Sequence, residues 1–280
     1  MAIRFDQSAP YEVEERDVPY LMRDGAELLA RIYRPKGEGA GLPAIVDIHG
    51  GAWNRNDRTS GALHCRALAA CGIVVASLDF RQGPAHRHPA ANEDIAAGVR
   101  WMRSEARALG IDRRQVGICG SSSGGQLALM HALTATGDAA VAYVLALYPV
   151  TDPLARYHYV LSREDEPMPE SGFDAKRLIA SHRAYFADEA AMAEASVTLL
   201  VESGQARARP PVFVAQPERD DNVPASITEG FVRAYRGVGG RIEHAHFPRE
   251  RHGFTTKPSP ETDKCIALMR DFVGRQLRSG

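Results

Sequence analysis

The feature that most constrains how this chain can fold is the run GSSSG at residues 120–124, which has the form G-x-S-x-G. An apolar run at residues 116–119 precedes it, and a helix-forming run at residues 126–133 follows it. Strand, sharp turn and helix in this order predict a nucleophile elbow, which presents the Ser122 hydroxyl at the carboxyl end of the strand. Small residues flank Ser122 because such a turn is strained, and the helix directs its positive end at the site. The alternative is a Ser/Gly-rich loop without catalytic function.

A second motif precedes the elbow in the chain. Residues 45–48 (IVDI) predict a buried strand that runs into His49-Gly50-Gly51-Ala52-Trp53. An HGG-type loop after such a strand supplies the second half of the oxyanion hole in hydrolases, because glycines let backbone N–H groups approach the substrate. Each such donor stabilises the tetrahedral intermediate by roughly 3 kcal/mol. A tight strand-to-loop turn is the alternative, and the elbow downstream argues against it.

If Ser122 is a nucleophile of this kind, an acidic residue and then a histidine should follow it along the chain. Residues 212–215 (VFVA) predict a buried strand, and Asp220 and Asp221 both lie beyond its carboxyl end, where catalytic residues of α/β sheets gather. A serine hydroxyl needs a base that titrates near neutral pH, and a carboxylate fixes the tautomer of that base. From the residues alone, either aspartate can be the acid.

The chain has ten histidines, and their positions separate His252 from the others. His244 and His246 alternate along a predicted strand and share one face, as wall or surface residues do. His49 belongs to the oxyanion loop, where we expect a structural hydrogen bond. Only His252 follows the last predicted strand, at residues 242–247, and has a glycine behind it. We therefore predict that His252 is the base.

Together these motifs resemble the α/β-hydrolases of the hormone-sensitive-lipase-like and acetyl-esterase branch. The resemblance spans residues 27–278, nearly the whole chain. It implies an α/β-hydrolase fold: a mostly parallel central sheet with helices on both faces and an inserted cap. The matching residues are His49-Gly50-Gly51, Asp79-Phe80-Arg81 with Pro84, Pro89, Ala91 and Asp94, residues 120–125, Asp220, and His252-Gly253-Phe254.

Residue by residue, the resemblance implies that Ser122 is the nucleophile and His252 the base. The acid is implied by a second likeness, since residues 220–223 (DDNV) are similar to the D-D-x-V segment of prolyl-oligopeptidase-like hydrolases, in which the first Asp serves. We therefore expect Asp220 to be the acid. The implied oxyanion-hole donors are the backbone N–H groups of Gly51, Ala52 and Ser123.

Four positions depart from the pattern of that branch, and they bear on the substrate rather than on the catalytic residues. Ala52-Trp53 replaces the third glycine and its usual follower, which resembles the HGG-x-W loop of kynurenine-formamidase-like and short-chain carboxylesterase relatives. Ser121 replaces an acidic residue, and His86 stands where Glu is frequent. We assign Trp53 to substrate binding, as a wall of the acyl pocket; the alternative is that it packs under the cap.

Strands and helices alternate along the chain, which predicts a mostly parallel sheet within one domain, residues 1–280. Residues 151–209 do not fit this alternation, because they separate two predicted strands by far more residues than an ordinary crossover connection contains. A long segment after the carboxyl end of a strand must overhang the site, so we predict a cap. The alternative is that this segment is a crossover helix with additional elements on the protein surface. The predicted strands lie near residues 12–16, 28–34, 45–48, 73–78, 116–119, 143–147, 212–216 and 242–247, and the predicted helices near residues 59–70, 91–109, 123–136, 225–237 and 259–277.

The composition excludes several classes of function. A formal net charge of −1 gives no electrostatic attraction to nucleic acid or to an anionic membrane. Residues 1–17 have no apolar core and the longest apolar run, 139–150, is far shorter than a membrane span, so we expect neither a signal peptide nor membrane contact. We expect a cytoplasmic protein without cofactor or metal, and leave a homodimer open. Four cysteines show neither metal nor disulfide spacing: Cys65, Cys71, Cys119 and Cys265.

These observations predict a carboxylesterase-type serine hydrolase that acts on small short-acyl esters through an acyl-enzyme intermediate. An amide hydrolase of the arylformamidase (kynurenine formamidase-like) or peptidase type is the alternative, because ester and amide hydrolysis use the same three side chains. A non-catalytic ligand-binding protein on the same fold is the third hypothesis, and the intact set of Ser122, Asp220 and His252 argues against it.

Overall fold

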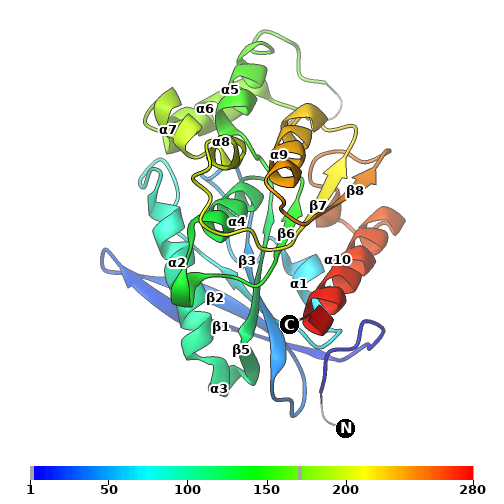
Figure 1. Ribbon diagram of the computed structural model, residues 1–280. Coiled ribbons are helices and arrows are strands. Elements are labelled where there is room, and N and C mark those ends of the chain that lie inside the picture. The colour runs from blue at the N-terminus through cyan, green and yellow to red at the C-terminus, as the bar shows by residue number, and fades with distance from the viewer. Residues whose placement is uncertain (1–2, 170–171, 280) are drawn as a thin grey trace.

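Eight strands form one sheet in the computed structural model, which describes residues 3–169 and 172–279 (Figure 1). The remaining residues of the predicted single domain, 1, 2, 170, 171 and 280, lie outside the described part. Across the sheet the strands run β1-β2-β4-β3-β5-β6-β7-β8; β1 pairs antiparallel with β2 and β2 with β4, and all later neighbours are parallel. The bounds are β1 (Val13–Arg23), β2 (Ala26–Pro35), β3 (Leu42–Ile48), β4 (Val74–Leu78), β5 (Ile111–Ser121), β6 (Val144–Leu147), β7 (Val212–Pro217) and β8 (Ile242–Phe247).

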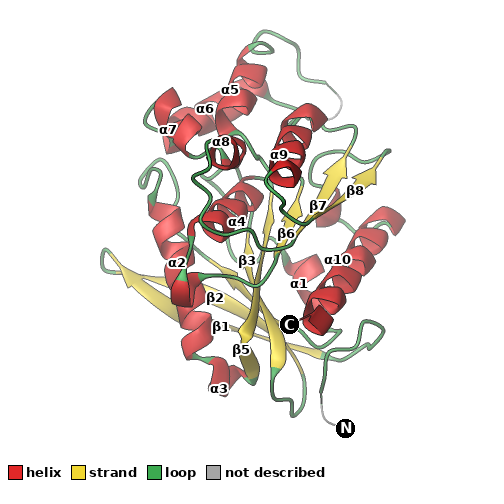
Figure 2. Ribbon diagram, in the orientation of Figure 1, coloured by secondary structure: helices red, strands yellow, loops and turns green. Residues whose placement is uncertain are grey.

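Helices cover both faces of this sheet (Figure 2). Along β3, Val46 and Ile48 pack toward the layer of α2, α4 and α9, whereas Ile45 packs toward the layer of α1 and α10. This alternation places apolar side chains on both faces of the central strands, as a sheet covered twice requires. The predicted mostly parallel sheet with helices on both faces is therefore confirmed. The bounds are α1 (Ala62–Ala69), α2 (Ala90–Ser104), α3 (Ala106–Leu109), α4 (Ser123–Thr134), α9 (Ala225–Gly237) and α10 (Pro260–Ser279), with single 3-10 turns η1 (Gly137–Ala139) and η2 (Phe254–Thr256).

The first two strands are longer than the sequence predicts. They form an antiparallel hairpin around Asp24 and Gly25, whose φ angles of 51° and 79° make the tight turn. Most side chains of β1 are exposed or partly exposed, so its hydrophobic pattern is weak. Because edge-strand pairing is carried by backbone hydrogen bonds, the sequence pattern alone underestimates its length.

The segment at residues 151–209 forms four short helices beyond the carboxyl ends of the parallel strands (Figure 1). Each helix begins at a residue whose side chain accepts a hydrogen bond from a backbone N–H three positions later, which stabilises a short helix where propensity alone does not. The bounds are α5 (Pro153–Leu161), α6 (Ala175–Tyr185), α7 (Glu189–Glu194) and α8 (Val197–Glu202). The capping residues are Asp152, Asp174, Asp188 and Ser196.

A buried polar contact joins α1 to the sheet. The Asp47 carboxylate accepts hydrogen bonds from His64 Nε2 and Ser77 Oγ, each at 2.8 Å. Asp47, His64 and Cys65 offer ligand atoms within 4.8 Å of one another, but both oxygens of Asp47 already have protein partners. All four cysteines are buried and unpaired. In the part of the chain that is described, no helix combines the length and apolar character that crossing a membrane requires.

Two buried histidines make the fold sensitive to acid. Burial lowers the pKa of His131 to about 4 and that of His182 to about 3. The unfolded chain, whose histidines titrate near pH ~6.5, therefore binds more protons below that pH than the folded chain does. This contribution to stability is complete above about pH 6.5 and is lost as the pH falls toward 4.

We therefore expect His131→Gln to flatten the pH dependence of stability. Between pH 7.5 and 5.0 its unfolding free energy should fall by about 2 kcal/mol less than that of the wild type, measured by urea denaturation. The control is His86→Gln, since His86 is only partly buried. Equal slopes for His131→Gln and the wild type would show that the buried imidazole is not responsible.

Candidate active site

The end of β5 and the start of α4 form a strained turn at Ser122. Ser122 has φ 54° and ψ −120°, a backbone conformation that costs a non-glycine residue about 1–3 kcal/mol. Two glycines make room for it: a Cβ on Gly120 would lie 2.2 Å from the Gly124 carbonyl oxygen, and one on Gly124 would lie 2.2 Å from that of Ile48. The predicted strand, turn and helix are thus present, and the turn sits directly against the end of β3.

Ser122, His252 and Asp220 form a continuous hydrogen-bonded chain. Ser122 Oγ lies 2.8 Å from His252 Nε2, and His252 Nδ1 lies 2.8 Å from Asp220 Oδ2. When Nδ1 donates to the carboxylate, Nε2 is free to accept the serine proton. The Asp220 side chain is 2% exposed and that of His252 is 18% exposed, so this pair is largely shielded from water while the imidazole edge stays accessible.

The loop after β7 distinguishes the two candidate acids. The second oxygen of Asp220, Oδ1, accepts hydrogen bonds from the backbone N–H groups of Asn222 and Val223, each at 2.8 Å. Those bonds fix the carboxylate in position and stabilise its charge. Asp221 instead pairs with Arg251 at 2.9 Å, where both side chains are exposed to solvent. The structure therefore brings Asp220, and not Asp221, to the imidazole.

The HGG loop places backbone N–H groups beside Ser122. Gly50 lies so close to the elbow that a Cβ on it would be 2.9 Å from the Ser121 carbonyl oxygen. Gly51 has φ 128° and Ala52 has φ 51°, which turns the loop back over the site. Among the described residues, the N–H groups of Gly51, Ala52 and Ser123 have no hydrogen-bond acceptor. The N–H groups of the three predicted oxyanion donors are therefore not used by other described residues.

His49 and the segment after β4 support this loop from below. His49 is buried, its Nδ1 lies 2.8 Å from the Gly50 carbonyl oxygen, and its ring stacks on Phe80 at 4.3 Å between centroids. The Asp79 carboxylate accepts hydrogen bonds from the backbone N–H and the guanidinium of Arg58, at 2.9 and 2.8 Å. His49 therefore makes the structural hydrogen bond expected of it.

Arg81 forms an ion pair on the other side of this segment. It binds the buried carboxylate of Asp94, with its Nε and Nη2 both 2.9 Å from carboxylate oxygens. That contact ties the segment after β4 to α2, so both Asp79 and Arg81 hold this segment in place.

Trp53 packs under the helices of residues 151–209 and does not line the cleft. Its side chain is 1% exposed, and its ring stacks on Tyr185 at 5.6 Å and meets Phe186 edge-on at 5.0 Å. Its indole Nε1 donates to Gln126 Oε1 at 2.9 Å, and Gln126 Nε2 donates to the Ala195 carbonyl at 2.9 Å. Of the two placements considered for Trp53, the structure shows the second, because neighbouring aromatic rings enclose it.

A cleft with a volume of about 200 Å³ opens at Ser122. Its walls come from the HGG loop, the elbow, the His252 loop and the first two helices of residues 151–209. The sequence did not predict the three arginines that line the cleft, because tertiary packing sets the register of those helices and the conformation of the HGG loop: Arg55, Arg156 and Arg177. The other lining residues are Gly50, Gly51, Ala52, Asn56, Ser60, Ser121, Tyr148, Leu178, Asn222, His252, Gly253 and Thr256.

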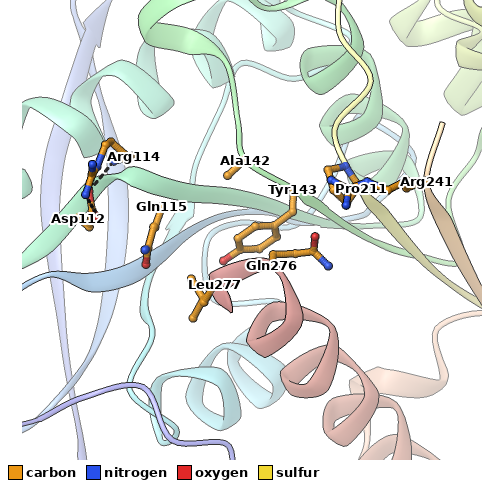
Figure 3. Close-up of a pocket in the computed structure, with 9 residues that line it drawn as sticks. All are labelled: Asp112, Arg114, Gln115, Ala142, Tyr143, Pro211, Arg241, Gln276 and Leu277. Atoms are coloured by element: carbon orange, nitrogen blue, oxygen red, sulfur yellow. Dashed lines mark hydrogen bonds and ion pairs between the residues drawn. The ribbon is translucent and has the colours of Figure 1, made fainter. Parts of the chain in front are cut away.

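A second cavity, of about 240 Å³, lies at the opposite end of the sheet (Figure 3). Tyr143 at the amino end of β6 and Gln276 of α10 line it, and Asp112 pairs with Arg114 at its rim. No histidine, cysteine or serine is among its described lining residues, so the nucleophilic chemistry belongs to the cleft at Ser122.

Comparison with known proteins finds relatives of this chain. A sequence profile of the family described as alpha/beta hydrolase fold matches residues 45–256. Among curated proteins, the chain is 27% identical over 258 residues to esterase LipC of Mycobacterium tuberculosis, covering 85% of this chain and 59% of that protein. It is 35% identical over 146 residues to an ethyl acetate hydrolase of Pseudomonas putida, covering 50% of this chain and 46% of that protein. The chain thus spans about half to three-fifths of the length of these relatives.

Solved structures show the same fold. The structure of an esterase from Pyrobaculum calidifontis is similar with a TM-score of 0.77 and 26% identity, over 95% of this chain and 86% of that one. EstE1, a carboxylesterase cloned from a metagenomic library, matches with a TM-score of 0.79 and 24% identity, over 96% of this chain and 91% of that one. At 24% identity, the similarity to EstE1 shows only that the two chains share a fold.

We expect Gly124→Ala to disrupt the elbow. Its Cβ would overlap the carbonyl oxygens of Ile48 and His49, at 2.2 and 2.4 Å, and neither backbone can move without shifting β3. The unfolding free energy should fall by about 3 kcal/mol or more, measured by urea denaturation. Gly230→Ala in α9 is the matched control, because its Cβ meets only Thr198 Cγ2 at 3.9 Å and alanine favours a helix. Equal stabilities of the two variants would refute the close packing described here.

Proposed function

The chain belongs to the family with the α/β-hydrolase fold, and from that premise we propose that it is a serine carboxylic-ester hydrolase. The observation that carries the proposal is the hydrogen-bonded chain from Ser122 through His252 to Asp220, which ends in a cleft beside three unused backbone N–H groups. A nucleophile, an oriented base and an oxyanion site within one cleft are the parts that acyl transfer requires.

In the proposed reaction, His252 Nε2 takes the proton of Ser122 while Oγ attacks the ester carbonyl. The carbonyl oxygen becomes an oxyanion, which accepts hydrogen bonds from the backbone N–H groups of the HGG loop and of Ser123. The positive end of α4 lies at the same point and favours that charge. Collapse of the intermediate breaks the bond to the alkoxide, which takes the proton from His252, and leaves an acyl-enzyme.

Water completes the cycle. His252 removes a proton from a water molecule that attacks the acyl carbonyl, and the same N–H groups hold the second oxyanion. The carboxylic acid leaves as Ser122 Oγ regains its proton. Throughout, Asp220 stays ionised, keeps the proton on Nδ1 and stabilises the imidazolium form of His252.

The proposed substrates are small esters with short acyl groups. The cleft volume of about 200 Å³ is small, and Trp53, Tyr185 and Phe186 close the space behind the HGG loop. The segment at residues 151–209 acts as a cap in this proposal, since Arg156 and Leu178 from its helices line the cleft opposite Ser122. The ethyl acetate hydrolase and esterases among the relatives support an ester rather than an amide substrate.

We also propose that the protein works in the cytoplasm. Its four unpaired, buried cysteines suit a reducing compartment. The homodimer stays a prediction, which light scattering of the purified protein tests.

Ser122→Ala should abolish hydrolysis of p-nitrophenyl acetate without unfolding the protein. The loss of kcat should be of order 10⁴ to 10⁶, because among the described hydroxyl groups at the cleft it is that of Ser122 that is hydrogen-bonded to His252. Asp220→Asn should lower kcat by about 10⁴, since the amide favours the wrong imidazole tautomer.

The neighbouring residues supply the controls. Ser121→Ala should retain most activity, and Asp221→Asn should cost less than about tenfold because it breaks only an exposed ion pair. A larger loss in Asp221→Asn than in Asp220→Asn would place the acid one residue later.

Acyl-chain selectivity tests the size of the site. We expect kcat/KM for p-nitrophenyl esters to be highest for acetyl to butyryl groups and to fall steeply for longer chains, because the small cleft has no room for them. The measurement covers acyl groups from two to twelve carbons, with N-formylkynurenine as the amide comparison. A maximum at eight carbons or beyond contradicts the proposed short pocket, and faster hydrolysis of the amide contradicts the ester assignment.

A further inference from the structure

Arg156 is a buried cation without a hydrogen-bond partner. It belongs to α5, its side chain is 0% exposed, and Nε, Nη1 and Nη2 have no acceptor among the described residues. Its guanidinium lies over the ring of Trp53, with 5.5 Å between Cζ and the ring centroid. A guanidinium with five N–H donors is costly to bury unless an acceptor or an anion reaches it. Because Arg156 lines the cleft at Ser122, that acceptor can enter with the substrate.

Two further arginines line the same cleft. Arg177, from α6, and Arg55, from the loop after Trp53, have no ion-pair or side-chain hydrogen-bond partner within residues 3–169 and 172–279. The pKa of Arg156 is lowered to about 10, chiefly by burial; the charge of Asp220 opposes this shift and the charge of Arg177 adds to it. Burial and then Arg177 likewise lower the pKa of Arg55. Arg177 therefore repels both Arg156 and Arg55.

No described carboxylate lines this cleft to balance them. The charge of Asp220 acts on Arg156, but both carboxylate oxygens of Asp220 already accept hydrogen bonds, from His252 and from backbone N–H groups. A neighbouring cavity of about 220 Å³, which shares Arg177, Asn222 and His252 with the cleft, adds Arg219 and the Arg251–Asp221 pair at the mouth. Positive charge thus extends from the buried wall to the entrance.

We propose that the cleft binds esters that carry a second group, a carboxylate, and that Arg156 and Arg177 bind that carboxylate while Ser122 attacks the ester. A planar guanidinium matches the two oxygens of a carboxylate, and the low-dielectric wall around Arg156 strengthens the contact. Arg55 and the arginines at the mouth attract the anion toward the cleft. This inference rests on the proposed ester-hydrolase function and names its substrate class.

Matched substrate pairs test the inference on either side of the ester. One pair has the charge on the acyl side: monoethyl glutarate and its neutral amide, ethyl 4-carbamoylbutanoate. The other has it on the alcohol side: 4-acetoxybenzoate and 4-acetoxybenzamide. In at least one pair, kcat/KM for the anionic member should exceed that of the neutral member by about tenfold or more at low ionic strength. The advantage should shrink as salt is added, since the residues at the mouth are exposed.

Variants then assign the effect to residues. Arg156→Met should reduce the ratio of anionic to neutral kcat/KM by about tenfold or more, chiefly through a higher KM for the anionic ester. Arg177→Gln should reduce the ratio by a smaller factor and, being at the surface, carries the test if Arg156→Met fails to fold. Lys176→Gln is the matched control, because it removes the neighbouring positive charge of α6 outside the cleft and should leave the ratio unchanged.

The outcomes separate this inference from the function on which it rests. Equal kcat/KM within both pairs, with Ser122-dependent hydrolysis of p-nitrophenyl acetate intact, overturns the carboxylate site and leaves the ester hydrolase standing. A ratio unchanged in both arginine variants also overturns it. If the wild type hydrolyses no ester at all, the proposed function fails and the inference fails with it.

Discussion

The site depends on how closely the first turn of α4 packs against the end of β3. Glycine at position 124 brings the helix within van der Waals contact of the Ile48 and His49 carbonyl groups, where any Cβ would overlap. That approach puts the Ser122 hydroxyl, the Ser123 N–H and the HGG loop in one place. The strain at Ser122, with φ 54°, is held there by packing on both sides and by the backbone bond from its N–H to the Leu147 carbonyl at 2.9 Å.

Electrostatic differences between neighbouring residues assign the remaining roles. Asp220 and Asp221 are chemically identical and adjacent, yet one is 2% exposed and receives three hydrogen bonds, whereas the other forms an exposed ion pair. A buried, fully hydrogen-bonded carboxylate can hold an imidazole in one tautomer, and an exposed one is screened by water. The arginines differ in the same way: Arg251 forms an ion pair with Asp221, whereas Arg156 is buried and has no hydrogen-bond partner among the described residues. We therefore place the carboxylate of the proposed substrate at Arg156 in the cleft rather than at the mouth.

Much of this arrangement could be predicted from the sequence, and the limits have physical reasons. The mostly parallel sheet and the positions of Ser122 and His252 follow from local patterns, because a strand, a strained turn and a helix each leave a pattern in nearby residues. The first hairpin was predicted too short because its exposed strands have no strong hydrophobic pattern. The sequence left Trp53 between two placements, since only tertiary packing against Tyr185 and Phe186 decides between them. Arg156 and Arg177 were not predicted because nothing local sets which face of a short helix turns toward the cleft.

Covalent labelling tests the central claim, that Ser122 is a nucleophile activated by His252, most directly. An O-alkyl 4-nitrophenyl methylphosphonate mimics the tetrahedral intermediate and phosphonylates an activated serine. Peptide mapping by mass spectrometry after stoichiometric release of 4-nitrophenolate should find a single phosphonyl group, on Ser122, with no labelling of Ser121 or Ser123. The label should form slowly or not at all in His252→Ala. Labelling of another residue, or esterase activity that survives the reagent without any adduct on Ser122, would contradict the account.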